Sequence, residues 1–174
     1  MTPEALLARV ATILPHATQL PLEEMRGQAV VVVQPDLVAE ALRTLRDDPE
    51  LRMDVLSDLT AVDYFGRTPR YEVVYQLRSI TQYHRLRVKT PIDGPEPVVP
   101  TATGLWKSAQ WAERECFDMF GIRFAGHPDL RRILMYPEFQ GHPLRKDYPL
   151  NQRWELVPER DPITQPWFPR TEGR

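Results

Sequence analysis

The stretch ERECFDMFGIRFAGHPDLRRILMYPEFQGHPLRKDYPL runs from Glu113 to Leu150 and changes character halfway along. It begins as an expected helix rich in charged and aromatic residues. It continues as a strip of proline, arginine, histidine and aromatic residues with too little apolar material for a core of its own. The stretch therefore divides the chain into an expected folded domain, residues 1–125, and an expected extended arm, residues 126–174.

Proline sets the expected conformation of this arm. Eight of the chain's eighteen prolines follow Gly126. The interior of a helix tolerates none of them, and their spacing prevents a regular sheet. We therefore predict an extended arm with isolated turns, whose side chains have nothing within their own chain to pack against and need a partner.

Hydrophobic periodicity predicts three helices before the arm. Thr2 suits an N-cap, Pro3 the first helical position, and Asp36 the cap of the second helix. Gly121 follows the third helix, at the position where a left-handed residue commonly closes a helix. The expected helices cover residues 3–14, 37–46 and 105–120.

Strand patterns predict a small mixed sheet between these helices. Tyr71–Arg78 alternates between apolar and polar residues, and we expect it to pair antiparallel with Tyr83–Lys89. Residues 18–34 are expected to form a hairpin that turns near Gly27 and contains a central valine-rich strand.

Two segments are expected to lack regular structure. LSDLTAVDY, which begins at the end of a short strand over residues 53–56, predicts a loop, and Pro91–Pro100, with four prolines, predicts a stiff connector. The predicted fold class is α+β: a two-layer domain with helices on one face of a mixed sheet, followed by a long, extended, proline-rich C-terminal arm.

Composition excludes several functions. The formal net charge is −2, so the basic footprint of a nucleic-acid-binding domain is missing. Cys116 is the one cysteine, so neither an internal disulfide nor a cysteine-ligated cluster is expected. The longest aliphatic run, Ala29–Val33, is far shorter than the ~20 residues of a membrane-spanning helix.

The third helix carries three candidate acid/base or metal-binding residues. Glu113 and Glu115 point about 160° apart on a helix, whereas Glu115 and Asp118 lie about 60° apart and could share a site. We expect these acids to form ion pairs with Arg114 or with other arginines. A buried stripe is expected, with Cys116 as a packed thiol; its members are Leu105, Ala109, Ala112, Cys116 and Met119.

Two Gly-His-Pro triplets follow, at His127 and His142. We interpret each as a turn whose imidazole bonds a backbone carbonyl or a partner carboxylate, and catalysis or metal binding as the alternative. Arg131, Arg132 and the pair at 145–146 are expected to form charge-assisted contacts to a protein partner. The expected aromatic anchors of the arm are Tyr136, Phe139, Tyr148, Trp154, Trp167 and Phe168.

Three motifs together resemble one family: LSDLTAVDY, TGLWKSAQWAERECFDMFGIRFAGHPDLRRIL and GHPLRKDYPL. They are similar to the C subunit of bacterial NADH:quinone oxidoreductase, respiratory complex I, over about Asp54 to Leu150. The most specific part of the resemblance is Glu113-Arg114-Glu115, Asp118 and then His127 and Arg131.

The resemblance implies a peripheral structural and assembly subunit on the cytoplasmic side of the cell membrane, attached only through its complex. It implies that the chain has no catalytic, cofactor-binding or metal-binding residues of its own, because FMN, iron–sulfur clusters and quinone lie in other subunits. The arm would wrap the hydrogenase-like D subunit, which helps to form the quinone site. The expected contact residues are Arg114, Glu115, Asp118, His127, Arg131, Arg132, His142, Arg145, Lys146, Asp147 and Tyr148.

Three other functions stay open at this point. The chain could be the equivalent subunit of a membrane-bound hydrogenase or another donor:quinone dehydrogenase. It could be a stand-alone hydrolase or metal enzyme that uses His127, His142 and Glu115, or an RNA-binding accessory protein. For a complex subunit, we expect a chain cut after Gly126 to fold but not to assemble.

Overall fold

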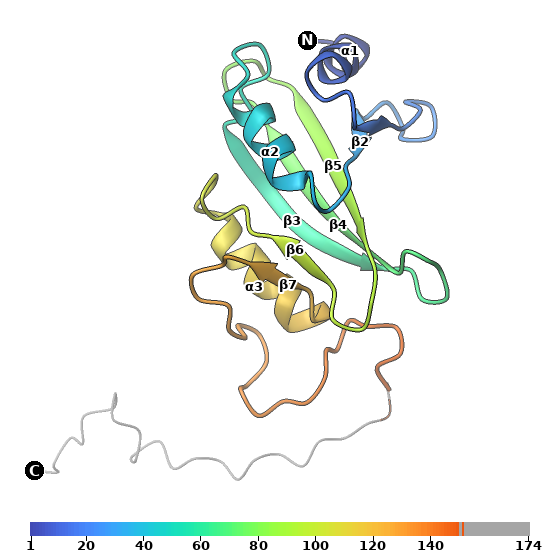
Figure 1. Ribbon diagram of the computed structural model, residues 1–174, viewed down its shortest axis with the longest axis vertical. Helices are drawn as coiled ribbons and strands as arrows, with labels where there is room; N and C mark the ends of the chain where they lie inside the picture. Colours follow the sequence, from blue (N-terminus) through green and yellow to red (C-terminus); the bar gives the residue numbers. More distant parts are fainter. Residues whose placement is uncertain (150, 152–174) are drawn as a thin grey trace, which may run out of the picture.

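The computed structural model describes residues 1–149 and 151 (Figure 1). Its helices and strands, in chain order, are α1 (Pro3–Ile13), β1 (Thr18–Gln19), β2 (Val30–Val32), α2 (Val38–Asp47), β3 (Val55–Asp63), β4 (Tyr71–Arg78), β5 (Arg85–Ile92), β6 (Val98–Pro100), α3 (Ala109–Phe120) and β7 (Arg123–Ala125). A five-stranded sheet has the order β1-β2-β5-β4-β3, and β6 and β7 form a separate parallel pair. Among the described residues, no helix is both long and apolar enough to cross a membrane.

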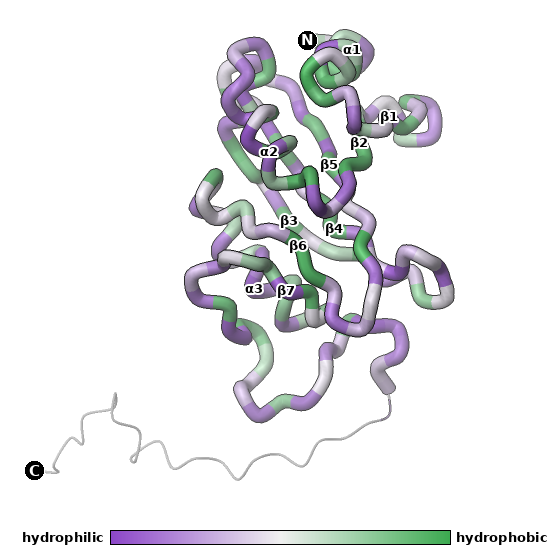
Figure 2. Tube along the Cα trace, in the orientation of Figure 1, coloured by the Kyte–Doolittle hydropathy of each residue, from purple (hydrophilic) through white to green (hydrophobic). Residues whose placement is uncertain are grey.

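The predicted α+β class, with helices on one face of a mixed sheet, is confirmed. β4 pairs antiparallel with β3 and β5, whereas β2 pairs parallel with β5. Alternate β4 residues, including Tyr75, pack in one hydrophobic cluster with buried residues from all three helices. Figure 1 shows α2 and α3 on the same side of the sheet, and Figure 2 shows hydrophobic stretches in β5 and β6 and a mixture of hydrophilic and hydrophobic residues along the helices.

Helix ends follow the sequence where the signal is local. Thr2 Oγ1 accepts a hydrogen bond from the Ala5 N–H at 3.4 Å, and Gly121 closes α3 with a φ of 73°. Asp36, however, does not cap α2, which begins after Leu37 without a side-chain cap. α3 begins at Ala109 rather than at residue 105, because tertiary hydrogen bonds hold the preceding turns, as in the Trp106 Nε1 donation to the Met53 carbonyl at 3.1 Å.

The expected loop LSDLTAVDY is instead most of strand β3, so that prediction is wrong. A register shift between Leu56 and Asp58 interrupts the two-residue alternation that marks a strand. Side chains near α3 satisfy outward-facing carbonyls of this edge strand: Ser108 Oγ donates to the Leu56 carbonyl at 3.0 Å. The strand is therefore stabilised by tertiary contacts that its own sequence pattern does not predict.

The expected stiff connector over residues 91–100 is also wrong in part. β5 continues to Ile92, and β6 lies at the end of the segment. Proline can still accept hydrogen bonds: the Pro97 carbonyl accepts from the Arg123 N–H at 2.8 Å. Pairing with β7 therefore needs few N–H donors from this proline-rich segment.

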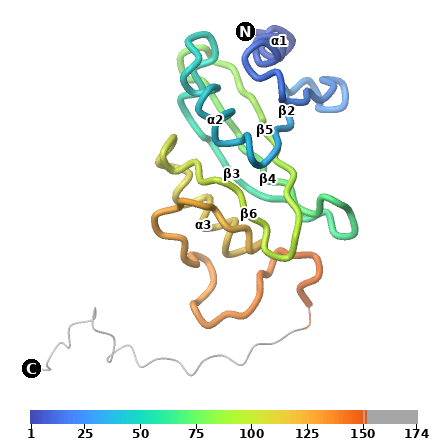
Figure 3. The backbone as a smooth tube through the Cα atoms, in the orientation of Figure 1, coloured from blue at the N-terminus to red at the C-terminus, as the bar shows by residue number. Residues whose placement is uncertain are grey.

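Residues 127–149, which we call the docked segment, return to the domain instead of leaving it. Figure 3 follows them from β7 past the end of α3 toward the ends of β3 and β4. The expectation that this part of the arm has nothing within its own chain to pack against is wrong, because Leu130 and Met135 pack against the core. The expected anchors Trp154, Trp167 and Phe168 lie outside the described residues.

Candidate functional site

Helix α3 carries three buried charged residues: Glu113, Arg114 and Asp118. The expected apolar stripe is only partly confirmed, because Ala109, Cys116 and Met119 are buried while the other two expected members are half-buried. Of the four remaining buried positions of the helix, three carry charged side chains and the fourth is Phe120. α3 is therefore covered on two sides, by the sheet and by the docked segment.

Asp118 is fully buried and binds the backbone of the docked segment. Its Oδ2 accepts hydrogen bonds from the N–H groups of Ile133 at 3.0 Å and of Leu134 and Met135 at 2.8 Å. Its Oδ1 accepts from Arg132 Nη1 at 2.7 Å. Burial alone would raise the pKa of this carboxyl, but these donors together hold the pKa below its usual value.

Arg114 binds the same stretch of backbone through its carbonyls. Its Nε donates to the Arg131 carbonyl and its Nη2 to the Arg132 carbonyl, each at 3.1 Å. Its guanidinium also lies over the Trp111 ring, 5.2 Å from the centroid. Together with Asp118, Arg114 satisfies backbone donors and acceptors of a segment that has no regular structure.

The carbonyls at the C-terminal end of α3 are bonded by the second Gly-His-Pro motif. His142 Nδ1 donates to the Asp118 carbonyl at 2.9 Å, and Arg145 Nε donates to the Phe120 carbonyl at 2.5 Å. Arginine and histidine are favourable here because the last carbonyls of a helix have no partner within it. Burial is the largest cause that lowers the pKa of His142, and it outweighs the hydrogen bond to Asp118.

The first Gly-His-Pro motif is held in the same way. His127 Nε2 bonds the Gln110 carbonyl at 3.1 Å, and its Nδ1 accepts from the Asp129 N–H at 3.0 Å. The interpretation of each motif as a turn with the imidazole on a backbone carbonyl is therefore confirmed. Both ring nitrogens of His127 have partners within the chain, so this imidazole has no free lone pair for a metal.

A second ionic cluster, absent from the sequence-based expectations, fixes the end of the docked segment. Arg70 donates to both oxygens of the buried Asp63 carboxylate at 2.8 Å, and its Nη2 lies 2.9 Å from Asp147. The Lys146 N–H also donates to Asp63 Oδ2 at 2.8 Å. Asp63 and Arg70 lie on either side of the turn between β3 and β4. A prediction of β3 as a strand would therefore have placed them close together.

Glu113 has no cationic partner among the described residues, so the expected ion pair is wrong for this acid. Its two oxygens accept hydrogen bonds from Thr101 Oγ1 at 2.5 Å and from the Ala102 N–H at 2.6 Å. Burial raises the pKa of Glu113 to about 7 and outweighs these two neutral donors. The ion-pair prediction is confirmed for Asp118, whose partner is Arg132.

Cys116 and Glu115 are the remaining candidate functional residues on α3. Cys116 is a buried thiol, as predicted, and burial raises its pKa, which disfavours the reactive thiolate. Glu115 is exposed, whereas Asp118 points inward. The two therefore do not share a site, and in residues 1–149 and 151 no group of three or more histidine, cysteine or acidic side chains could hold a metal ion.

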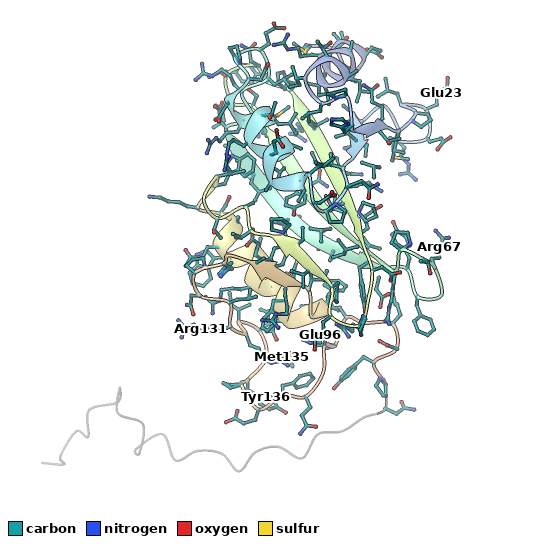
Figure 4. All side chains as sticks on the ribbon, viewed as in Figure 1. Glu23, Arg67, Glu96, Arg131, Met135 and Tyr136 are labelled. Carbon is teal, nitrogen blue, oxygen red and sulfur yellow. The ribbon has the colours of Figure 1, made fainter. Side chains whose placement is uncertain are left out.

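Nine of the eleven expected contact residues fall into two groups, and the other two, His127 and Tyr148, are half-buried. The first group holds the docked segment to its own domain and consists of Arg114, Asp118, Arg132, His142 and Arg145. Asp118 is fully buried, so it cannot contact a partner directly. Those that stay at the surface are Glu115, Arg131, Lys146 and Asp147. Figure 4 shows Arg131, Met135 and Tyr136 along the docked segment, below α3.

Large exposed apolar side chains also lie on α3 and on the docked segment. Trp111 on α3 is 60% exposed and Leu134 on the docked segment is 61% exposed. Arg114 connects the two elements: its guanidinium lies over the Trp111 ring and bonds the carbonyls two and three residues before Leu134. We call Trp111 and Leu134 the apolar ridge.

Known proteins resemble this chain over most of its length. The family described as "Respiratory-chain NADH dehydrogenase, 30 Kd subunit" matches residues 31–154. A protein of Roseiflexus sp. (strain RS-1), named as the C subunit of NADH-quinone oxidoreductase, is 52% identical over 144 residues, which are 83% of this chain and 82% of the relative. A protein of the same name from Citrifermentans bemidjiense is 50% identical over 139 residues, 80% of this chain and 82% of the relative.

Two solved structures share the fold. One is described as Nqo5 of the trypsin-resistant fragment (1-134); it has a TM-score of 0.63 and 30% identity, and the match covers 75% of this chain and all of that fragment. The other belongs to the membrane-bound sulfane sulfur reductase, described as an archaeal respiratory membrane complex. It has a TM-score of 0.71 and 25% identity, over 85% of this chain and 86% of that one.

Proposed function

Because the chain belongs to the family of the 30-kDa subunit of respiratory-chain NADH dehydrogenase, we propose that it acts as a structural and assembly subunit of the peripheral arm of NADH:quinone oxidoreductase. Relatives at about half identity carry the name of the C subunit of that enzyme. In this role the chain carries no catalytic residue. FMN, iron–sulfur clusters and quinone are bound by other subunits.

The observation that carries this proposal is the way in which the docked segment is held. Asp118 bonds three consecutive N–H groups of the segment, and Arg114 bonds two of its carbonyls. An irregular segment fixed in this way is ordered before it meets a partner, so less conformational entropy is lost on binding. Such a segment suits a rigid brace better than a moving catalytic loop.

The apolar ridge is the surface that we assign to the partner. Trp111 and Leu134 are large exposed apolar side chains held on a rigid support, and Arg131 and Glu115 are exposed around them. Large apolar anchors that become buried on binding, with a polar rim around them, are typical of protein interfaces. We propose that the ridge contacts the hydrogenase-like D subunit and holds the quinone site and its electron donors at fixed separations.

The proposed location follows from the same role. The chain would lie at the cell membrane on its cytoplasmic side and would be attached through the complex. The equivalent subunit of a hydrogenase-type complex is the less favoured assignment. Relatives named as the C subunit of NADH-quinone oxidoreductase reach about half identity, whereas the sulfane sulfur reductase structure has 25%.

The test removes the ridge without disturbing its support. In cells that carry the complex, Trp111→Ala with Leu134→Ala should lower recovery of the chain in purified complex at least tenfold. The matched control is Val98→Ala, an apolar residue that is 51% exposed on β6. The melting temperature of each isolated chain checks that folding is intact. Normal recovery of the ridge variant in quinone-reducing complex would contradict the proposal.

A further inference from the structure

The five-stranded sheet has a second face, which points away from the hydrophobic core. On β4 this face carries Glu72, Gln76 and Arg78, which alternate with the buried core residues. Their partners on β5 continue it, with Arg85 opposite Arg78 and Arg87 opposite Gln76. We call the half of this face around Arg78, Arg85 and Arg87 the basic face.

The basic face holds uncompensated positive charge. None of Arg78, Arg85 and Arg87 forms an ion pair within the described residues, and the hydrogen bond from Arg87 Nε goes to the neutral Gln76 at 3.3 Å. Like charges directly opposite each other destabilise an antiparallel pair, and Arg78 faces Arg85 in this way. The fold thus keeps an arrangement that is unfavourable in the isolated chain.

A groove adjoins these arginines. It has a volume of about 660 Å³, and its lining includes Met1, Pro3 at the start of α1, Arg78 and Arg85. Asp58 is the one carboxylate side chain in this lining. The groove is therefore concave and carries an excess of guanidinium groups.

Tyr83 lines the same groove with an exposed aromatic side chain. It is 83% exposed, and its backbone has a φ of 54°, in the left-handed region that tyrosine rarely adopts. The loop that carries it is pinned by the buried Ser79, whose N–H donates to the His84 carbonyl at 3.0 Å, and by His84 Nε2, which bonds the Leu51 carbonyl at 2.7 Å. Tyrosine and arginine held in this way are characteristic hot spots of protein interfaces.

We propose that the basic face binds an acidic segment of a partner polypeptide, at a docking surface separate from the apolar ridge. Carboxylates of that segment accept paired hydrogen bonds from the guanidinium groups and remove the repulsion between Arg78 and Arg85. Nucleic acid is the less suitable anion, because the whole chain has a net charge of −2. The proposal rests on the chain working within an assembly, but not on which subunit covers the ridge.

Photo-crosslinking within the intact complex identifies the occupant. Tyr83 is replaced with p-benzoylphenylalanine, the complex is purified and irradiated, and the linked peptide is identified by mass spectrometry. Trp111→p-benzoylphenylalanine in the ridge serves as the parallel probe. We expect the Tyr83 probe to link to a segment of another polypeptide that is rich in aspartate and glutamate.

Every other result with the Tyr83 probe overturns the inference. These results are a link to residues 152–174 of the same chain, to a basic or neutral segment, to nucleic acid, or no link at all. If the Trp111 probe links to a neighbouring subunit in the same experiment, only the basic-face proposal fails. If neither probe links to another polypeptide, the proposed function fails as well.

A charge reversal separates binding from folding. Arg85→Glu places a carboxylate opposite Arg78, so the isolated chain should melt at the same or a higher temperature. The same variant should lower recovery of the chain in the complex at least fivefold, because it repels an acidic partner. Arg43→Glu on the exposed side of α2 makes the same change of charge elsewhere and should leave recovery unchanged. Equal recovery of Arg85→Glu and wild type would refute the inference.

Discussion

Glu113 and Asp118 lie five residues apart on α3, and both are fully buried, yet their surroundings act on their acidity in opposite directions. At the Asp118 end, three N–H groups and a guanidinium hold the pKa low. At the Glu113 end, where α3 meets the chain leaving β6, two neutral donors leave the pKa raised to about 7.

The difference teaches what each end of the helix does. A buried carboxylate that stays ionised needs donors that offset the loss of water, and only the docked segment supplies a cation together with several N–H groups. The Asp118 carboxylate is therefore stable in its ionised form only while the docked segment lies in place. The Glu113 end can instead take up a proton and keep its hydrogen-bond geometry.

Removal of the docked segment should have the largest effect. A chain cut after Gly126 loses every partner of the Asp118 carboxylate and uncovers apolar core at Leu130 and Met135. The loss is comparable with the whole stability of a domain, about 5–15 kcal/mol, so we expect an unfolded or aggregated product. This reverses the expectation that a cut after Gly126 leaves a folded domain. Circular dichroism melts measure the effect.

A chain cut after Pro149 is the matched control, because it keeps every contact of the docked segment with the other described residues up to 149. It should melt within a few degrees of the full chain. Equal melting temperatures for the two truncations would show that the docked segment adds nothing to the stability of the domain, and the contrast between the two ends of α3 would then lose its basis.

Asp118→Ala should have the next largest effect. It leaves Arg132 and three N–H groups of the docked segment without their acceptor, so we expect a loss of about 3–5 kcal/mol. Asp118→Asn keeps one acceptor oxygen and should lose less. Urea unfolding of the isolated chains measures both, and similar free energies of unfolding for Asp118→Ala and wild type would contradict the assignment.

In cells, Asp118→Ala and Arg114→Ala should lower the yield of assembled complex through the same loss of the docked segment. The cofactor content of the complexes that do form should not change. Loss of an iron–sulfur signal from fully assembled mutant complex would count against a purely structural role.

Glu113 should make stability depend on pH in the opposite sense from Asp118. Its pKa is raised from an ordinary 4.5 to about 7 on folding, so the unfolded chain ionises first as pH rises. Stability is therefore lost between about pH 4.5 and 7, by up to about 3 kcal/mol. Glu113→Gln keeps the shape but cannot ionise, so its stability relative to wild type should rise across this interval.

Urea titrations of both proteins at pH 5 and pH 8 give this relative stability. The comparison with wild type cancels the contributions of other groups, including His142, whose lowered pKa makes stability fall as pH decreases below about 6.5. A pH-independent difference between Glu113→Gln and wild type would show that Glu113 is ionised in the folded state across the whole range.

Arg114→Lys should have the smallest effect. A lysine ammonium cannot reproduce the guanidinium fork that bonds the carbonyls of Arg131 and Arg132 while lying over Trp111. We expect a loss of about 1 kcal/mol in urea unfolding. A loss as large as that of Asp118→Ala would mean that the carbonyl contacts matter as much as the N–H contacts.

Local signals in the sequence predicted local structure well. The cap at Thr2, the left-handed Gly121 and the strand Tyr71–Arg78 depend on near neighbours or on a two-residue period, and each is confirmed. The two Gly-His-Pro turns also bond backbone carbonyls as predicted. The helical face predicted to be apolar was incomplete, because charged residues can be buried wherever distant donors reach them.

The missed features depend on segments that are far apart in the chain. The cluster of Asp63, Arg70 and Lys146 needs the β3–β4 hairpin and the docked segment at one place, and a register shift at Asp58 concealed β3 itself. The β6–β7 pair likewise joins residues on either side of α3. No local period marks such contacts, so sequence reasoning had no signal for them.

The sequence by itself determined the three helices, the strand Tyr71–Arg78 and the chemistry available to them, including which helix carries the acids and arginines. Only the tertiary structure decided how that chemistry is used. It gave Asp118 a cation and three N–H groups, gave Glu113 two neutral donors, and returned residues 127–149 to the domain. The reason is that the energy of a buried charge depends on donors brought from distant parts of the chain.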